Sequence, residues 1–334
     1  MLDDRKAAIL RAVVEEYIQT AQPVGSAHVA RNRDLLVSSA TVRNDMGVLE
    51  REGYLVQPHT SAGRIPTDKG YRFFVDSLDS PGPLDPSQTQ QVRSFFAKAH
   101  GELERMLADT SRLLSGLTDY AAVVVKPSAD VARIRSAQLV GLGSHTALMV
   151  VVLSNGSVEK RTLEITEQTG AAHMAAASAH LGAHLDGRAW EPAPAASSTG
   201  EHKVDDLVRR AVALVGTGSG VEAEQVFVGG AARMVSAFDA VDTIRQVLGI
   251  LEQQYVLVSL LRDVIDRGLS VAIGTEHGVL PLADCSIIVA PYEVEGEQVG
   301  TVGILGPTRM HYEQALAAVA VVSKRLSRAL SEGT

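Results

Sequence analysis

The chain contains a single cysteine, Cys285, among its 334 residues. One thiol cannot form an intramolecular disulfide, and it cannot build a zinc site that needs several cysteines. Cys285 lies in the apolar run CSIIVAP, which favours a buried structural thiol over a reactive one. Redox and metal-thiolate functions are therefore not expected.

Aromatic residues are also scarce, at 4% of the chain. Proteins that bind single-stranded nucleic acid stack its bases on exposed rings, so this scarcity argues against such a ligand. The start of the chain lacks the pattern of a signal peptide, and no apolar run is long enough to cross a bilayer. We therefore expect a cytoplasmic protein with no membrane partner.

Catalytic motifs are missing as well. The sequence has no HExxH, no GxSxG and no pair of carboxylates with a supporting context. We therefore predict that the protein is not an enzyme and uses no cofactor. The remaining composition, with 46% hydrophobic and 21% charged residues, is typical of folded domains, and the length suits two or three of them.

The most informative stretch is SSATVRNDMGVLEREGYLVQPHTSAGRIPTDKGYR, residues 38–72. Its first part predicts a helix that Ser39 caps and Gly53 ends, with an apolar stripe of Val42, Met46 and Leu49. The opposite face is short and polar, as on a helix that enters the major groove of DNA. A strand at 54–56, a basic loop at 58–66 and a returning strand at 67–72 should follow.

Two helices should precede this one. Apolar residues recur at nearly helical spacing over 3–18, and Ser26 can cap a shorter helix over 27–32. Pro23 and Gly25 break the chain between them. This order of elements predicts a winged helix-turn-helix, in which the third helix meets DNA. A unit of this kind can instead bind protein, so that alternative stays open.

The distribution of charge supports DNA binding only mildly. Residues 1–75 contain ten Lys and Arg against nine Asp and Glu, whereas the rest of the chain contains 21 against 30. A nearly neutral unit at the head of an acidic chain is a weak indication of a nucleic-acid surface.

Residues 37–72 closely resemble the N-terminal signature of the HrcA family, the heat-inducible transcription repressors of bacteria. A second stretch, VGTVGILGPTRMHY at 299–312, resembles the C-terminal signature of that family. The spacing between the two stretches and the total length also fit, so the resemblance covers almost the whole chain. His311 departs from the pattern, because many members have an acidic residue there.

The segment after the first unit begins with a linker. Three prolines and a glycine in residues 79–88 predict this boundary. Apolar residues then keep helical spacing over 88–117, which predicts one helix of roughly 45 Å. This helix could pack on its own domain or on a partner chain.

The remainder of the chain alternates between strand and helix patterns. Strands are expected at 121–126, 133–142, 147–153 and 158–165, with a two-residue hairpin turn at Asn155-Gly156. A helical block follows over 167–215, and a flexible break at 191–200 interrupts it. Further strands and helices complete the chain from 226. These patterns predict an α+β protein with a helical insertion in an antiparallel sheet domain.

The resemblance names these parts. It implies a winged helix-turn-helix, then a GAF-like domain interrupted by an inserted dimerization domain. We expect the following boundaries: a DNA-binding domain at 1–78, a linker at 79–88, a GAF-like domain at 89–165 and 226–334, and an inserted domain at 166–225.

The candidate DNA-binding residues lie on the third helix and the basic loop. Arg43 and Asn44 are the residue types that form bidentate hydrogen bonds with guanine and adenine. Asp45 would repel phosphate, so it should pair with an Arg of its own domain. Arg43 and Arg64 are the strongest candidates, and each of the others could equally cap a helix or face solvent. The complete set is Ser39 and Thr41 for phosphates, Arg43 and Asn44 for bases, and His59, Thr60, Arg64 and Lys69 for the wing.

Three histidines form a second candidate site. His173, His180 and His184 lie on one face of an expected Ala-rich helix, and the last two have the spacing of two metal ligands. No cysteine or carboxylate cluster accompanies them. We therefore predict polar histidines at a helix interface, with a metal site as the alternative.

The resemblance then implies a function. The chain should be a homodimeric repressor of the CIRCE inverted-repeat operator on double-stranded DNA, which precedes chaperonin and chaperone operons. The GroEL chaperonin should keep it active. Two recognition helices related by a two-fold axis require an inverted repeat. The alternatives are a regulator that responds to a metabolite bound in its GAF-like domain, and a protein-interaction scaffold with no DNA role.

Overall fold

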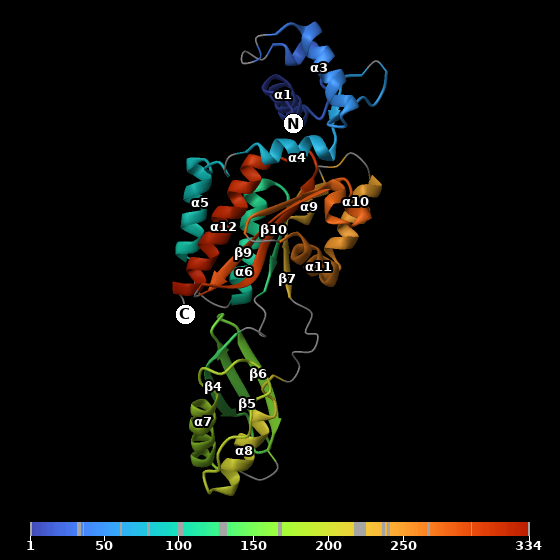
Figure 1. Ribbon diagram of the computed structural model, residues 1–334. Coiled ribbons are helices and arrows are strands. Elements are labelled where there is room, and N and C mark those ends of the chain that lie inside the picture. The colour runs from blue at the N-terminus through green and yellow to red at the C-terminus, as the bar shows by residue number, and fades with distance from the viewer. Residues whose placement is uncertain are drawn as a thin grey trace.

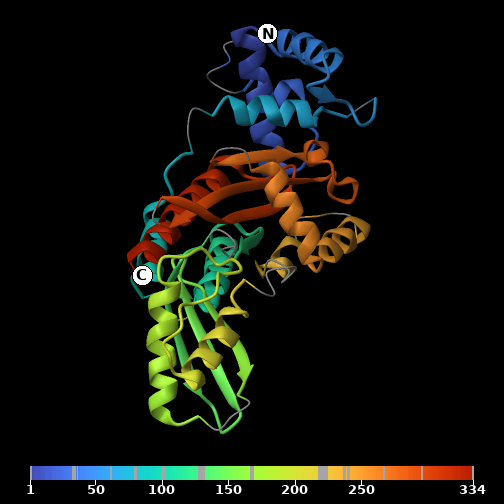
Figure 2. The same cartoon turned by 60° about the horizontal axis from the view of Figure 1, so that its bottom comes forward.

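The computed structural model describes residues 2–31, 35, 37–60, 62–78, 81–98, 103–126, 132–165, 169–216, 225–235, 238, 241–265, 268–294 and 296–332. It has an α+β fold in which all paired strands are antiparallel. Both views show an elongated molecule with an N-terminal unit at one end, a sheet domain in the middle and a smaller sheet at the other end (Figures 1 and 2).

The N-terminal unit forms around the apolar stripes of its helices. Ile9, Leu10 and Val13 of the first helix are fully buried, and so are Val42 and Met46 of the third. Its elements are α1 (Asp4–Thr20), α2 (Ser26–Val29), α3 (Ser39–Arg51), β1 (Leu55–Val56), β2 (Ile65–Pro66) and α4 (Asp68–Asp76).

Three local expectations in this unit differ from the structure. The N-cap of α2 is Gly25, and Ser26 is the first residue of that helix instead of its cap. The N-cap of α3 is Ser38 instead of Ser39, because the Ser38 hydroxyl accepts from the amide of Thr41 at 3.1 Å. The expected strand at 67–72 is the start of α4, since the Thr67 hydroxyl caps that helix by accepting from the Gly70 amide. The third member of the small sheet is instead Val24, which bridges Arg64.

The middle domain is a five-stranded sheet with helices on both faces. The order is β7-β3-β10-β9-β8. One core lies between the sheet and the helices α6 (Leu103–Thr118) and α12 (Tyr312–Glu332). A second core lies between the sheet and the helices α9 (Ala231–Val235), α10 (Val241–Leu251) and α11 (Gln254–Val264). The strands are β3 (Ala121–Val125), β7 (Val226–Gly229), β8 (Ser270–Ile273), β9 (Cys285–Val294) and β10 (Glu297–Pro307). The domain also has two short 3-10 turns, η1 (Gly274–His277) and η2 (Leu280–Leu282).

The helical pattern over 88–117 belongs to two helices instead of one. These are α5 (Pro86–Lys98) and α6 (Leu103–Thr118), and residues 99–102 lie outside the described part. The side-chain Nε2 of Gln88 donates to the carbonyl of Leu117 at 3.1 Å. In one straight helix these residues would be about 43 Å apart. The chain therefore folds back, and both helices pack on α12.

The insertion is larger than the helical block expected from the sequence. Strands β4 (Ile134–Gly141), β5 (Thr146–Leu153) and β6 (Val158–Glu164) pair only with one another among the described strands. They share a separate core with α7 (Ala171–Leu185) and α8 (His202–Val212) (Figure 2). Residues 134–164 were expected in the GAF-like sheet, but hydrogen bonding and burial join them to the inserted helices.

The connection to this insertion lies at one edge of the large sheet. Strands β3 and β7, which flank the insertion in sequence, are paired neighbours, and the Lys126 amide donates to Gln225. The chain thus leaves and returns at adjacent points. Within the insertion, the hairpin loop has three residues, Ser154 to Gly156, of which Gly156 takes positive φ.

Two further expectations concern single features. Cys285 is fully buried in β9, as the apolar run predicted, and burial raises the pKa of its thiol to about 12. No helix in the described ranges is long and apolar enough to span a membrane.

Candidate nucleic-acid interface

The third helix, α3, packs on the core of the unit with one face and exposes the opposite face to solvent. Val42, Met46 and Leu49 are fully buried against the unit's core. Arg43 and Asn44 are exposed on the opposite side, and neither has a hydrogen bond or ion pair with any described residue. A rigid helix therefore presents a guanidinium and an amide to solvent with their donors unused.

Asp45 pairs within its own domain, as the sequence analysis predicted. Its carboxylate, 8% exposed, accepts from Arg5 Nε at 2.8 Å and from Arg5 Nη2 at 3.3 Å. This fork ties α3 to the first turn of α1 and removes a free negative charge from the exposed surface of α3. The need for an Arg partner could be inferred from the sequence, but its identity as Arg5 depends on the tertiary fold.

Ser39 and Thr41 take part in local contacts at the start of α3. The Ser39 hydroxyl lies 3.4 Å from that of Ser26 in α2, and the Thr41 hydroxyl lies 2.9 Å from that of Ser38. The first contact joins α2 to α3, and the second lies within the N-cap of α3. Both hydroxyls remain at the N-terminal end of a 13-residue helix, where free amides and the helix dipole favour anions.

The basic loop between β1 and β2 is braced from inside. Gln57 Nε2 donates to the carbonyls of Thr60 and Ala62 at 3.1 and 2.9 Å, and the Ala62 amide donates to His59. His59 and Thr60 are exposed at this loop. Gln57 could not be identified from the sequence, because no residue pattern shows which side chain braces a loop.

The two remaining candidates, Arg64 and Lys69, are engaged elsewhere. Arg64, whose side chain is 17% exposed, binds Glu50 of α3 with Nε and Nη2 each 3.0 Å from the carboxylate. Lys69 donates to the carbonyl of Glu52 at 2.8 Å and lies 4.2 Å from the centre of the Tyr54 ring. Arg64 fastens the loop to α3, and Lys69 caps the C-terminal end of α3.

The three histidines of α7 each bind a different group on the loop that follows. His173 pairs with Glu201 at 2.9 Å, His180 with the carbonyl of Ser197 at 2.8 Å and His184 with that of Pro194 at 2.9 Å. No cluster of three potential metal ligands occurs among the residues that the structure describes. The shared face of α7 therefore anchors the Pro- and Ala-rich segment of the same chain.

The chain, a helical unit with a polar face joined to a two-part α+β body, is similar to known proteins over its whole length. The HrcA protein C terminal domain family matches residues 104–316. A heat-inducible transcription repressor HrcA from Kineococcus radiotolerans is 39% identical over 348 residues, covering 99% of this chain and 100% of its own. The Moorella thermoacetica protein of the same name is 36% identical over 345 residues, covering 99% and 98%.

A solved structure agrees with the fold over the full length. A crystal structure at 2.2 Å, described only as that of a hypothetical protein, is 25% identical and covers 100% of both chains with a TM-score of 0.69. With the family match and the full-length relatives, the assignment is plain. The chain belongs to the HrcA family.

Proposed function

We propose that the protein is a heat-shock transcription repressor whose N-terminal unit is a winged helix-turn-helix. The observation that carries this proposal is the exposed, unpaired Arg43–Asn44 face of α3 in a chain of the HrcA family. The order of the elements supports it, since three helices precede a β1–loop–β2 wing whose sheet includes Val24. Relatives with this full-length match carry the name of heat-inducible transcription repressors.

The roles of the site residues follow from what each side chain touches. Arg43 and Asn44 would contact base edges in the major groove. Ser39 and Thr41, with the amides of the first turn of α3, would face phosphates. His59 and Thr60 would be the wing contacts. Arg64 and Lys69 would act mainly by holding the wing and the end of α3, because they bind Glu50 and the carbonyl of Glu52.

We further propose that the body of the protein forms the dimer. The middle domain, residues 89–126 and 226–332, would be the GAF-like part, and residues 127–225 the inserted dimerization domain. One face of the small sheet is covered by α7 and α8, while the other exposes apolar side chains. Val140 and Val158 are each 46% exposed there, next to half-buried Leu148 and Val152 on β5. This face mixes apolar side chains with polar ones such as Gln138 and Lys160, and we take it as the surface on which a second copy of the sheet packs.

Replacing two valines of this face tests the dimer. The double variant Val140→Asp, Val158→Asp should weaken dimerization by about tenfold or more per substitution, because carboxylates would lose their hydration at the interface. Sedimentation at graded concentrations measures the dimer dissociation constant. Tyr255→Asp is the matched control, since Tyr255 is an exposed ring on α11, 82% accessible and outside the insertion. Unchanged dimerization in the double variant would move the interface elsewhere.

The operator and the regulation are proposed from what the resemblance to the HrcA family implies. We propose that the dimer binds the CIRCE inverted repeat and represses chaperone operons, with activity modulated by the GroEL chaperonin. If the active state is only marginally stable, heat lowers its population, and unfolded clients compete for the chaperonin. An operator affinity that neither heating nor added chaperonin changes would reject this mechanism.

A gel-shift titration tests the central function. Purified protein is titrated onto a duplex with the inverted repeat and onto a scrambled duplex, at two salt concentrations. We expect a preference for the repeat that persists at higher salt, because base contacts depend less on counterion release than phosphate contacts do. Equal binding to both duplexes, with and without chaperonin, would contradict the proposal.

The metabolite-responsive alternative has less support. A hollow of about 180 Å³ lies at the edge of the middle domain, between β3, β10 and α11, and Lys126 and Arg262 are among its lining residues. Ligand pockets usually measure roughly 300 Å³ or more. This hollow is therefore small for a metabolite site, and it gives no specific reason to prefer a ligand-controlled regulator.

A further inference from the structure

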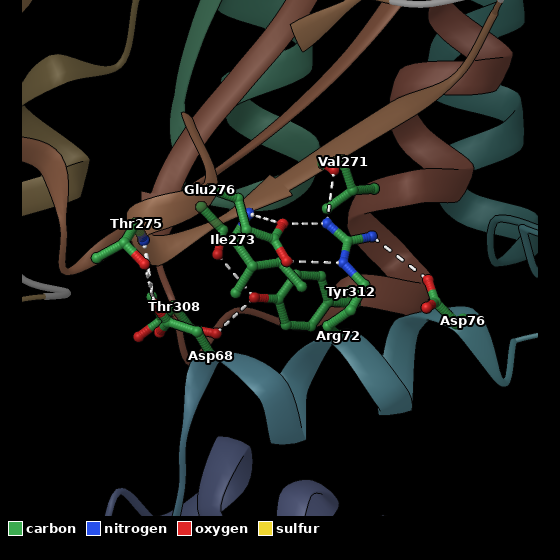
Figure 3. Close-up of polar contacts among 10 residues, drawn as sticks. Asp68, Arg72, Asp76, Val271, Ile273, Thr275, Glu276, Thr308 and Tyr312 are labelled. Atoms are coloured by element: carbon green, nitrogen blue, oxygen red, sulfur yellow. Dashed lines mark hydrogen bonds and ion pairs between the residues drawn. The ribbon is translucent and has the colours of Figure 1, made fainter. Parts of the chain in front are cut away.

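The N-terminal unit docks on the middle domain through a group of polar contacts from α4. Arg72 donates through Nε to Glu276 at 2.9 Å, pairs again with that carboxylate through Nη2, and reaches the carbonyl of Val271 at 2.8 Å (Figure 3). One turn earlier, the Asp68 carboxylate accepts from the amide and the hydroxyl of Thr275 at 3.1 and 3.0 Å. Two side chains of one helix thus bind a single segment, 271–276, about 200 residues away in sequence.

That segment is shaped to receive the helix. Gly274 has φ +55°, and a Cβ atom at this position would overlap the Asp68 carboxylate. Only glycine allows both this backbone conformation and this close approach. The Glu276 carboxylate is also held in place beforehand, because it accepts from the Ile273 amide at 2.8 Å. Burial acts to raise the pKa of Glu276, but the bonds from Arg72 and Ile273 hold that pKa below its usual value.

The same helix is fixed to the DNA-facing helix. The Thr67 hydroxyl donates to the Gly53 carbonyl at 2.7 Å, and Lys69 donates to Glu52, the C-cap of α3. Gly70 packs so closely on the Tyr54 carbonyl that a Cβ atom there would overlap it. The first turn of α4 therefore touches the end of α3 on one side and the middle domain on the other. Any rotation of α4 on the middle domain must turn α3 with it.

The other contacts at this junction are mainly apolar, and they belong to a core that the N-terminal unit shares with the middle domain. Tyr71 and Tyr312 pack with ring centres 6.0 Å apart, but the Tyr71 hydroxyl is buried without a hydrogen-bond partner among the described residues. A hollow of about 270 Å³ lies beside them, lined by residues of α1, α4 and the start of α12, including Glu15 and Glu313. Burial and the nearby Glu313 raise the pKa of Glu15. Apolar packing is non-directional, so it restrains the angle of the unit less sharply than the hydrogen bonds of Asp68 and Arg72 do.

We propose that Asp68 and Arg72, through Thr275 and Glu276, are positioning residues that fix the direction of α3 relative to the dimer body and so set the half-site spacing of the operator. This inference rests on the proposed repressor function. Ion pairs of this kind contribute little net stability, and their best attested use is to select one arrangement among several of similar energy. Without them the unit would be held by apolar contacts and by the linker that follows α4.

The test compares single charge reversals with their combination. Arg72→Glu and Glu276→Arg each break the pair, whereas the double variant restores opposite charges. Arg105→Glu and Glu252→Arg are controls, because both sites are exposed, lie away from the junction and change the net charge by the same amounts. Each protein is titrated onto inverted repeats whose central spacer differs in steps of one base pair over a full helical turn.

Wild-type protein and both controls should show one spacer optimum. Each single reversal should reduce the affinity ratio between the best and worst spacers by about tenfold, and the double variant should recover most of it. Single variants that keep the wild-type profile, or a double variant no better than the singles, would overturn the proposal.

A second measurement needs no DNA and separates this proposal from the repressor function. Spin labels at Arg51→Cys and Tyr255→Cys report the distance between α3 and α11, and fully buried Cys285 should not react. Labelled chains are diluted with unlabelled protein so that each dimer carries one labelled copy. The distance distribution should be narrow in wild type, broad in each reversal and narrow again in the double variant. Equal widths in all four proteins would overturn the inference even if operator binding is confirmed. If wild type shows no preference for inverted repeats, the repressor function fails, and the distances still decide whether this pair fixes the orientation.

Discussion

Replacing Arg43 by alanine is expected to lower affinity for the inverted repeat by about 5- to 150-fold per dimer half-site. The guanidinium is exposed and unpaired among the described residues, so all of its donors are available to a guanine edge. A bidentate pair of this kind discriminates between bases by roughly 1 to 3 kcal/mol, which gives this range. Because no partner inside the protein is lost, the folded state should keep its stability. Titration on matched and scrambled duplexes measures the change.

Arg51→Ala is the matched control for this variant. Arg51 is also an exposed arginine of α3, but it lies in the last turn, roughly 12 Å further along the helix axis. Its loss should reduce binding to both duplexes slightly and equally, through the phosphate contribution alone. Arg43→Ala should instead reduce the ratio of the two affinities and relax the preference at one base position.

The same comparison separates a repressor from a protein-interaction scaffold. If Arg43→Ala keeps the wild-type affinity ratio while its melting temperature is unchanged, α3 does not recognise bases through this side chain. A scaffold would in addition bind both duplexes weakly in the wild type. If Arg43→Ala lowers the ratio of the affinities for the matched and scrambled duplexes but keeps its melting temperature, only recognition of base sequence by Arg43 explains the result.

The N-terminal unit was the part most accessible from sequence. The amphipathic stripe of α3 and the need of Asp45 for an arginine partner follow from local spacing and charge, and the structure contains both. The expected strand at 67–72 was wrong because a threonine cap, Thr67, competes with the strand pattern. The bond between Arg64 and Glu50 could not be predicted, since it joins residues that the fold alone brings together. A basic loop residue is therefore not automatically a free DNA contact.

Long-range pairing accounts for the other differences. The apolar pattern over 88–117 is helical throughout, and the bond between Gln88 and Leu117, with the packing of both helices on α12, shows that the chain reverses within it. The strands at 134–164 carry the alternation expected of a sheet with one buried face. Alternation shows that a partner exists but does not show which strand it is. The assignment of β4, β5 and β6 to the insertion therefore required the structure.

Gly63→Ala should destabilise the N-terminal unit by about 2 to 3 kcal/mol, an overpacking effect with no easy relief. A Cβ atom at Gly63 would lie 2.5 Å from the carbonyl carbon and oxygen of Val24 and 2.6 Å from the carbonyl carbon of Pro23. These are backbone atoms, so no side-chain rotation can move them away. The overlap would push apart the bridge in which Val24 and Arg64 exchange two hydrogen bonds of 2.9 Å.

Separation of this bridge should also disturb the DNA-facing surface, because Arg64 connects the wing to Glu50 on α3. Gly25→Ala is the control, since Gly25 belongs to the same unit, has extended backbone and has no atom within 4 Å of a Cβ atom. Gly25 is the N-cap of α2, and replacing it by alanine should lower the stability of the unit by no more than about 1 kcal/mol. Amide hydrogen exchange of Val24 and Arg64, with thermal melting, measures both variants. If the amides of Val24 and Arg64 are equally protected in Gly63→Ala and Gly25→Ala, the wing can shift to accept a methyl group. Operator binding should then be intact in both variants.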